Sequence, residues 1–134
     1  MTERWTAEEL QRQLKSGKIK ARISKACYTP YKNKTEKAYA DNLEVLRLDG
    51  EIRYWRYEPV RLRLADKTWY TPDFMVINND FEIEFHETKG FMREAARVRI
   101  NVAAEIYPFF TFYLIYSKKG GWDINQIPTI KDKP

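Results

Sequence analysis

Two neighbouring stretches decide the fold of this chain: "TWYTPDFMVI" at 68–77 and "FEIEFHETK" at 81–89. Both are rich in β-branched and aromatic residues, and the short polar turn "NND" separates them, so they are predicted to form adjacent antiparallel strands. Each stretch also contains charged residues within the strand pattern. In the first, Asp73 directly follows Pro72, and in the second, Glu87 comes two residues before Lys89. Charged groups in strands cost folding free energy unless a partner offsets their desolvation. These charges therefore predict a functional site at the ends of the two strands.

Side-chain alternation along 81–89 indicates the chemistry of this site. One face holds Phe81, Ile83, Phe85, Glu87 and Lys89, and the other holds Glu82, Glu84, His86 and Thr88. Glu87 and Lys89 then lie about 7 Å apart and point the same way. A carboxylate so placed can hold a divalent cation, an ammonium can orient water or offset phosphate charge, and the Thr88 carbonyl offers a further oxygen of the kind Mg²⁺ prefers. His86 points away from Glu87, which favours a structural role over general base catalysis.

Two further carboxylates are candidates for the same site. Asp73 lies one hairpin away from Glu87, and without a cation the two acids would repel, which would drive one of them towards protonation. Pro72 removes a backbone donor and stiffens φ, which is tolerable where strand pairing is given up to aim a ligand. Glu36 falls on the inward stripe of a predicted helix. It can hold a metal, directly or through water, or it can complete a capping box with Asn33, and the spacing favours the two equally.

The remaining elements follow from periodicity and from turn residues. A helix is predicted over 33–50, capped by Asn33 and closed by Gly50. Segment 51–64 is β-rich, and Pro59 divides it into two strands or marks a bulge. A second helix covers about 91–107, with apolar rows at 95, 98, 102, 106 and at 96, 100, 103, 107, and 109–116 is a strand apolar on both faces. A short helix over 7–16 starts at a capping box from Thr6 to Glu9. The order helix, three or more strands, helix, strand predicts an α/β fold.

Composition bounds the classes of function. The 134 residues, 43% of them hydrophobic, suit one domain with a sizeable core. One cysteine and one histidine exclude an internal disulfide and argue against a zinc site. The sequence has no secretory leader and no membrane helix, so we expect a cytoplasmic protein without a membrane partner.

Segment 15–34 holds seven bases and no acid, which leaves a net charge of −2 for the rest of a chain whose total is +5. This basic arm predicts a polyanion partner such as nucleic acid, with a solvated leader as an equal alternative.

Pro72-Asp73 followed by Glu87-Thr88-Lys89, behind a helix bearing Glu36, resembles the PD-(D/E)xK nuclease superfamily. The signature "YTPDF…HE-x-KG" is similar to that of a family of small phage and prophage proteins, over roughly residues 30–118. The resemblance implies a restriction-endonuclease-like core (αβββαβ), with a central mixed sheet flanked by helices, in a nuclease-like domain at 35–134 after an arm at 1–34. It implies Asp73 and Glu87 as metal ligands, Lys89 as the catalytic lysine and Glu36 as an auxiliary acid.

Residues and resemblance together predict an endodeoxyribonuclease that depends on Mg²⁺, for which Mn²⁺ can substitute. Water attacks the phosphorus, Mg²⁺ on Asp73 and Glu87 stabilises the developing charge, with Thr88 and Glu36 as further ligands, and Lys89 positions the nucleophile or the phosphate. The preferred substrate is branched DNA, as for Holliday-junction resolvases in phage recombination, replication or packaging, and a homodimer is expected. Contacts to the DNA backbone are assigned to Lys20, Arg22, Lys25, Lys32, Lys34, Arg93 and Arg97. The alternatives are an inert DNA-binding or assembly module with a nuclease fold, and a nuclease of ordinary duplex or single-stranded DNA or of RNA.

Overall fold

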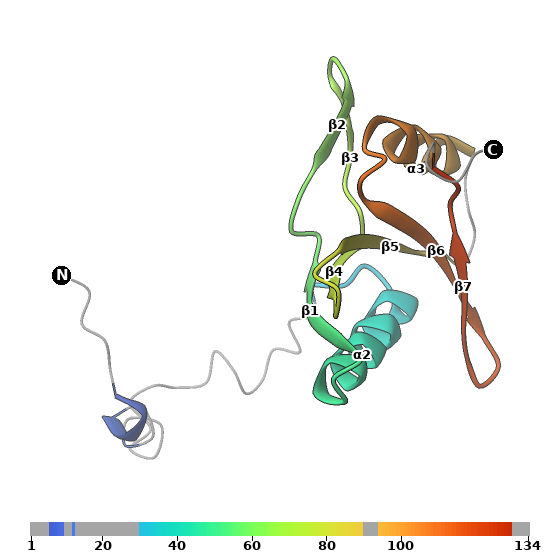
Figure 1. Ribbon diagram of the computed structural model, residues 1–134. Helices are drawn as coiled ribbons and strands as arrows, with labels where there is room; N and C mark the ends of the chain where they lie inside the picture. Colours follow the sequence, from blue (N-terminus) through green and yellow to red (C-terminus); the bar gives the residue numbers. More distant parts are fainter. Residues whose placement is uncertain (1–5, 10–11, 13–29, 90–93, 130–134) are drawn as a thin grey trace. The chain divides into compact units, whose positions relative to one another are not determined.

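The computed structural model describes residues 6–9, 12, 30–89 and 94–129 of the chain, which separates into two units, Met1–Pro30 and Tyr31–Pro134. In the first unit residues 7–9 are helical and the predicted capping box is present. The Glu9 N–H donates to Thr6 Oγ1 at 3.2 Å, and the Glu9 carboxylate accepts from the Thr6 N–H at 2.8 Å. Residues 31–34, which the sequence placed in the basic arm, lie with the larger unit. All of the following elements belong to that larger unit (Figure 1).

A mixed five-stranded sheet forms the centre of the larger unit, which confirms the predicted α/β class. In spatial order its strands are β1 (Ile52–Tyr57), β4 (Phe74–Asn78), β5 (Ile83–Lys89), β6 (Thr111–Lys118) and β7 (Gly121–Gln126). β4 pairs antiparallel with β1 and with β5, β6 runs parallel to β5, and β7 returns antiparallel to β6. A parallel pair needs a crossover connection, which contains α3 (Glu94–Ile106).

Helix α2 (Lys34–Leu48) covers one face of the sheet (Figure 1). Asn33 caps it by accepting from the Glu36 N–H at 2.9 Å, and Gly50 follows it with φ 79°, a left-handed conformation that favours glycine. Both predicted ends are therefore confirmed. The buried stripe of the helix packs on three buried residues of the sheet, and the cluster consists of Tyr39, Ala40, Leu43, Phe74, Val76 and Ile115.

Helix α3 covers the opposite face of the sheet (Figure 1). Ile100 and Ala103 are fully buried against strand residues such as Phe85, so one of the two predicted apolar rows does face the core. The prediction that the other row also belongs to the apolar face packed on the core is wrong. In that row Val98 is 51% exposed and Ile106 is 43% exposed. A helix lying on one sheet buries a single stripe, and a second apolar row one residue out of phase turns towards solvent.

Segment 62–70 forms a separate hairpin, so the expectation of one strand over 68–77 is wrong. β2 (Leu62–Ala65) pairs antiparallel with β3 (Thr68–Tyr70) as a two-stranded sheet, packed beside α3 through Leu62 and Tyr70 (Figure 1). The chain leaves strand conformation at 71–73, where Pro72 has no N–H to donate to a ladder. Pro59 divides β1 from β2, as predicted. Asp73 therefore stands just before β4 rather than inside a continuous strand.

The turn between β4 and β5 corrects the start of the second diagnostic stretch. β5 begins at Ile83, and Phe81 lies in the turn with φ 62° and 70% of its surface exposed. Asn78 Oδ1 organises this turn by accepting from the backbone N–H groups of Asp80 at 2.9 Å and Glu82 at 3.0 Å. Phe81 therefore does not belong to the apolar face that continues into Glu87.

Candidate functional site

Asp73 and Glu87 meet at one end of the sheet. Phe74 pairs with His86 in the β4–β5 register, so Asp73 comes level with Glu87 at the next position. The Asp73 N–H donates to Glu87 Oε2 at 3.3 Å. The Asp73 carbonyl accepts from the N–H of Glu58 at 2.8 Å, and Glu58 has φ 44°, which few non-glycine residues adopt. The backbone around Asp73 is thus fixed from both neighbouring strands.

The Asp73 carboxylate is buried and oriented by a single neighbour. Asp73 is 5% exposed, and its Oδ2 accepts from the Thr88 N–H at 3.0 Å and from Thr88 Oγ1 at 3.1 Å. In the described part of the chain, Oδ1 accepts no hydrogen bond. Thr88, predicted to contribute its carbonyl oxygen, therefore also sets the direction of the Asp73 side chain with its two donors.

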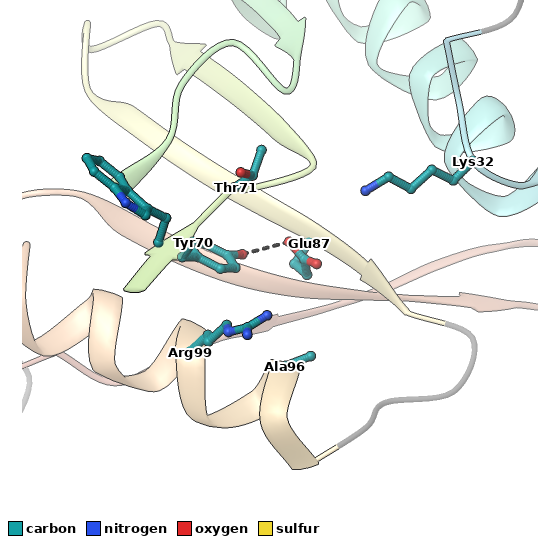
Figure 2. A pocket seen from close by; sticks show the side chains of 7 residues that line it. Lys32, Tyr70, Thr71, Glu87, Ala96 and Arg99 are labelled. Carbon is teal, nitrogen blue, oxygen red and sulfur yellow. Dashed lines mark hydrogen bonds between the residues drawn. The ribbon is translucent and has the colours of Figure 1, made fainter. Parts of the chain in front are cut away.

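Glu87 is held by a buried tyrosine and a lysine. The Tyr70 hydroxyl donates to Glu87 Oε2 at 2.6 Å (Figure 2), and Tyr70 itself is 6% exposed. The Lys89 Nζ lies 3.5 Å from Glu87 Oε1, with both side chains largely buried. The alternation predicted for β5 thus places an ammonium beside the carboxylate, on the same face of the strand.

The pKa values of Asp73 and Glu87 are both raised, mainly because the two carboxyl groups are shielded from solvent. Burial, then the charge of Glu87, then that of Glu36 raise the pKa of Asp73 to about 7, against the opposing effect of the Thr88 hydrogen bonds. Burial also raises the pKa of Glu87, although the Tyr70 hydrogen bond and the Lys89 charge act in the other direction. Two carboxylates this close are poorly tolerated as a pair of anions, and a bound cation would relieve the repulsion.

Glu36 is capped by Asn33 at the start of α2, and its carboxylate lies in the pocket without completing the predicted capping box. Its N–H donates to Asn33 Oδ1 at 2.9 Å, as in a helix cap, but its carboxylate accepts from the Lys32 N–H at 2.7 Å and the Tyr57 hydroxyl at 2.9 Å rather than from the Asn33 N–H of a strict capping box. Glu36 is 4% exposed and lines the same pocket as Asp73. It is therefore an inward acid of the site as well as part of the helix start.

Lys32, two residues before the start of α2, lines the same pocket. Its Nζ lies 2.8 Å from Glu58 Oε1, and that hydrogen bond is the main reason why the pKa of Lys32 is raised. The pocket so formed has a volume of about 430 Å³. Its lining is strongly polar and consists of Lys32, Asn33, Thr35, Glu36, Asp73, Glu87, Thr88 and Lys89. The residues singled out from sequence at 36, 73 and 87–89 therefore share one pocket.

The donor set fits one magnesium ion on two carboxylates. Within the described ranges, no group of three or more Asp, Glu, His or Cys side chains is arranged to hold a metal, so Glu36 is not a direct third ligand in this arrangement. Mg²⁺ in proteins is commonly held by one or two carboxylates and keeps several waters. Asp73 and Glu87 meet that requirement, and their raised pKa values indicate negative charge that the protein does not fully compensate.

His86 lies on the other face of β5, as alternation predicted. Its Nδ1 is 2.5 Å from the Tyr39 hydroxyl and its Nε2 is 2.9 Å from Glu84 Oε1. His86 is 7% exposed within the α2 side of the core. One ring nitrogen joins β5 to α2 and the other contacts Glu84 within β5, which is a structural role.

The basic residues assigned to DNA have different positions. Lys32 lines the pocket, whereas Lys34 at the start of α2 and Arg97 on α3 are exposed. Lys20, Arg22, Lys25 and Arg93 lie outside the described residues.

Sequence analysis missed Tyr70 and Tyr57, whose hydroxyls bind the site carboxylates. The available signal for Tyr70 was its position directly ahead of the Thr-Pro-Asp break, since the end of β3 must pass close to Asp73.

No helix in the described ranges is both long and apolar enough to cross a bilayer. Comparisons of this chain with family models, with curated proteins and with solved structures give no match.

Proposed function

We propose that this protein is a metal-dependent endodeoxyribonuclease. The observation that carries the proposal is the buried Asp73 beside the largely buried Glu87, with the Asp73 N–H on Glu87 Oε2 and the Lys89 ammonium 3.5 Å from Glu87 Oε1. Two carboxylates and one amine at the end of a strand pair are the groups that hydrolysis of a phosphodiester needs in order to bind a divalent cation and to place water or phosphate. Neither a cysteine nor a histidine is required.

The side chains have separate tasks in this proposal. Asp73 and Glu87 hold Mg²⁺ or Mn²⁺, which when bound polarises the phosphate and lowers the pKa of water. Lys89 donates to the attacking water or to a non-bridging phosphate oxygen. Thr88 and Tyr70 keep the two carboxylates in position, and Glu36 lies where it can accept a hydrogen bond from a water in the pocket.

The order of elements supports a restriction-endonuclease-like core. Taken without the β2–β3 hairpin, α2 is followed by the antiparallel strands β1, β4 and β5, then by α3, and then by β6 parallel to β5. The candidate ligands stand at the start of the second of these strands and at the end of the third. This order supports the αβββαβ arrangement implied by the resemblance to the PD-(D/E)xK superfamily, with the hairpin as an insertion and β7 as an additional edge strand.

The proposed substrate is DNA, and branched DNA in particular. The basic segment 15–34 offers phosphate contacts that do not depend on sequence and weaken with salt. Contacts of this kind follow the shape and charge of the DNA backbone rather than its base sequence. Cutting of both strands at a junction would require a homodimer, and we place the protein in phage or prophage DNA recombination, replication or packaging within the bacterial cytoplasm.

Cleavage of labelled four-way junction, flap, duplex and single-stranded DNA with Mg²⁺, Mn²⁺ or EDTA tests the proposal. We expect cutting with either metal, none in EDTA, and a rate at least about 100-fold lower for Asp73→Ala and for Lys89→Ala. The matched controls are Asp80→Ala, at the opposite end of the same strand pair, and Lys118→Ala at the end of β6, which are both exposed and should keep full activity.

The outcomes separate the alternatives. Activity that persists in EDTA and in both site variants would overturn the mechanism. A wild-type protein that binds DNA but cuts none of the four substrates would identify an inert binding module. Equal cutting of all four substrates would remove the preference for branched DNA and leave the class of enzyme in place.

A further inference from the structure

A second pocket adjoins the carboxylates, with a volume of about 230 Å³. It shares Lys32 and Glu87 with the first pocket, so the two meet at these side chains and form one groove. Figure 2 shows Lys32 and Arg99 reaching towards Glu87 from opposite sides, with the Tyr70 hydroxyl directed at the carboxylate. Beyond Glu87 the groove is lined by Arg99 of α3 and by Trp69 of β3. The candidate metal centre is therefore open on one side towards a tryptophan and an arginine.

The outer face of the β2–β3 hairpin continues this surface. Leu62 and Tyr70 of the hairpin are buried in the core beneath α3, so the alternate residues turn outward. Trp69 is paired in register with Arg63, and the Arg61 guanidinium lies 5.0 Å from the centre of the Trp69 ring. Trp69 remains 43% exposed although it adjoins a mostly buried site.

An exposed indole with arginines around it, beside two carboxylates, has the properties of a nucleic-acid contact. Aromatic rings stack on unpaired bases and arginines bind the phosphates between them, whereas bases within a duplex are already stacked on each other. Trp69 lines the same pocket as Glu87, so a base on Trp69 would belong to a nucleotide close to the phosphate at the carboxylates.

We infer that Trp69 is the stacking platform for an unpaired base beside the scissile phosphate, with Arg61 and Arg99 on the flanking phosphates. The inference rests on the proposed nuclease function and narrows its substrate to nucleic acid with an unpaired nucleotide next to the cut. A fully paired duplex can occupy the carboxylates only where it opens, so junctions, forks and single strands are the favoured substrates. The hairpin inserted between β1 and β4 is the element that confers this selection.

Fluorescence anisotropy of labelled oligonucleotides in EDTA tests the inference without cleavage. The full chain is titrated onto a single-stranded DNA and onto the blunt duplex of the same sequence. For single-stranded DNA we expect Trp69→Ala to raise Kd about tenfold or more, and Trp69→Phe to raise it less than about threefold, since phenylalanine keeps a stacking face. Duplex binding should be the same for all variants.

Phe81→Ala is the matched control. Phe81 is also an exposed ring beneath an arginine, 4.0 Å from the Arg53 guanidinium, but it lies in the β4–β5 turn at the end of the strands opposite the carboxylates. Its removal should leave binding to both DNAs unchanged. Equal Kd values for wild type, Trp69→Ala and Phe81→Ala on single-stranded DNA would overturn the inference.

Cleavage then distinguishes failure of the inference from failure of the proposed function. If the nuclease proposal holds, Trp69→Ala should raise KM for a forked DNA about tenfold while kcat changes much less, because the base contact positions the strand and takes no part in the chemistry. Wild-type cleavage with an unchanged KM in Trp69→Ala would overturn the stacking role alone. A loss of single-stranded DNA binding in Trp69→Ala, with no cleavage by wild type, would support the platform and reject the nuclease.

Discussion

Glu87 is the residue on which the contacts of the site converge. It accepts from the Tyr70 hydroxyl and the Asp73 N–H through Oε2 and lies beside Lys89 through Oε1. A carboxylate held in this way keeps one orientation when a metal binds, which reduces the entropy lost on coordination. Loss of a supporting hydrogen bond of this kind lowers metal affinity or activity about 10- to 100-fold in metalloproteins.

Replacement of Tyr70 by phenylalanine isolates that supporting bond. We expect Tyr70→Phe to raise the Mg²⁺ concentration for half-maximal cleavage about 10- to 100-fold, measured as rate against Mg²⁺ concentration. The matched control is Tyr107→Phe, which removes another 2.6 Å hydroxyl bond, to the Arg63 carbonyl on the hairpin. An unchanged Mg²⁺ requirement in Tyr70→Phe would show that Tyr70 does not orient Glu87.

The charge of Asp73 should lower the stability of the metal-free protein, although cleavage requires it. Its raised pKa means that its charge is unfavourable in the metal-free fold, whereas an asparagine keeps an oxygen for the two Thr88 donors. At pH 8 in EDTA we expect Asp73→Asn to raise the free energy of unfolding by about 1–2 kcal/mol, measured by urea denaturation, while cleavage is lost. A destabilised Asp73→Asn protein would contradict the repulsion between Asp73 and Glu87.

At the scale of single residues, the sequence predicted those site residues whose positions follow from the two-residue period of a strand. Asp73, Glu87 and Lys89 were predicted to come together because a two-residue period and one short hairpin determine their faces. Tyr70, Trp69 and Lys32 were not assigned to the groove beside Glu87, because their places depend on the hairpin and on the start of α2 folding back over the sheet. Such contacts between distant segments have no local pattern in the sequence.

At the scale of elements, Phe74 anchors α2 to the strand that begins at the site. It is fully buried and makes ring contacts at centroid distances of 5.4–6.3 Å, with Tyr31, Tyr39, Trp55 and Tyr57. These contacts join α2, β1 and β4, and so hold Glu36 and Asp73 in one pocket.

Truncation of Phe74 should therefore destabilise the protein strongly. We expect Phe74→Ala to lower the free energy of unfolding by about 3–5 kcal/mol, measured by thermal and urea denaturation. Phe81→Ala, which removes a ring that is 70% exposed, should change it by less than about 1 kcal/mol. Comparable losses in the two variants would contradict the position of Phe74 at the centre of the α2 cluster.

Elements bounded by strong local signals were predicted well. The Asn33 cap, Gly50 and Pro59 fixed the ends of α2 and the break after β1. The separate hairpin was missed because segment 68–77 reads as strand throughout, and only tertiary packing decides that β3 joins β2 while β4 joins the central sheet. The inward stripe of α3 was ambiguous for the same reason, since both apolar rows satisfy helical periodicity.

At the scale of the whole molecule, the site makes stability depend on pH and on metal. Asp73 and Glu87 have raised pKa values in the fold, so these two groups together bind more protons in the folded protein than in the unfolded chain between about pH 4 and pH 7. Unfolding therefore releases protons, and stability is lost as pH rises through the folded pKa values. Divalent metal should oppose this loss, since it binds the ionised folded site.

We expect the free energy of unfolding in EDTA to fall by about 2 kcal/mol between pH 5 and pH 8. This fall should be much smaller with Mg²⁺ at a concentration well above its Kd for the site. Urea denaturation across pH measures both. The Asp73→Asn/Glu87→Gln double variant serves as the control, and its profile should be flatter and independent of Mg²⁺. A wild-type profile equal to that of the double variant would show that the two acids are not coupled.

Binding of Mn²⁺, followed by the electron paramagnetic resonance signal of the free ion, tests most directly whether Asp73 and Glu87 together hold a divalent cation. The account predicts that the wild-type protein binds Mn²⁺ and that Asp73→Asn and Glu87→Gln each weaken binding at least about tenfold, while Asp80→Asn binds as wild type does. Equal Mn²⁺ binding by all four proteins, or no binding by wild type, would contradict it.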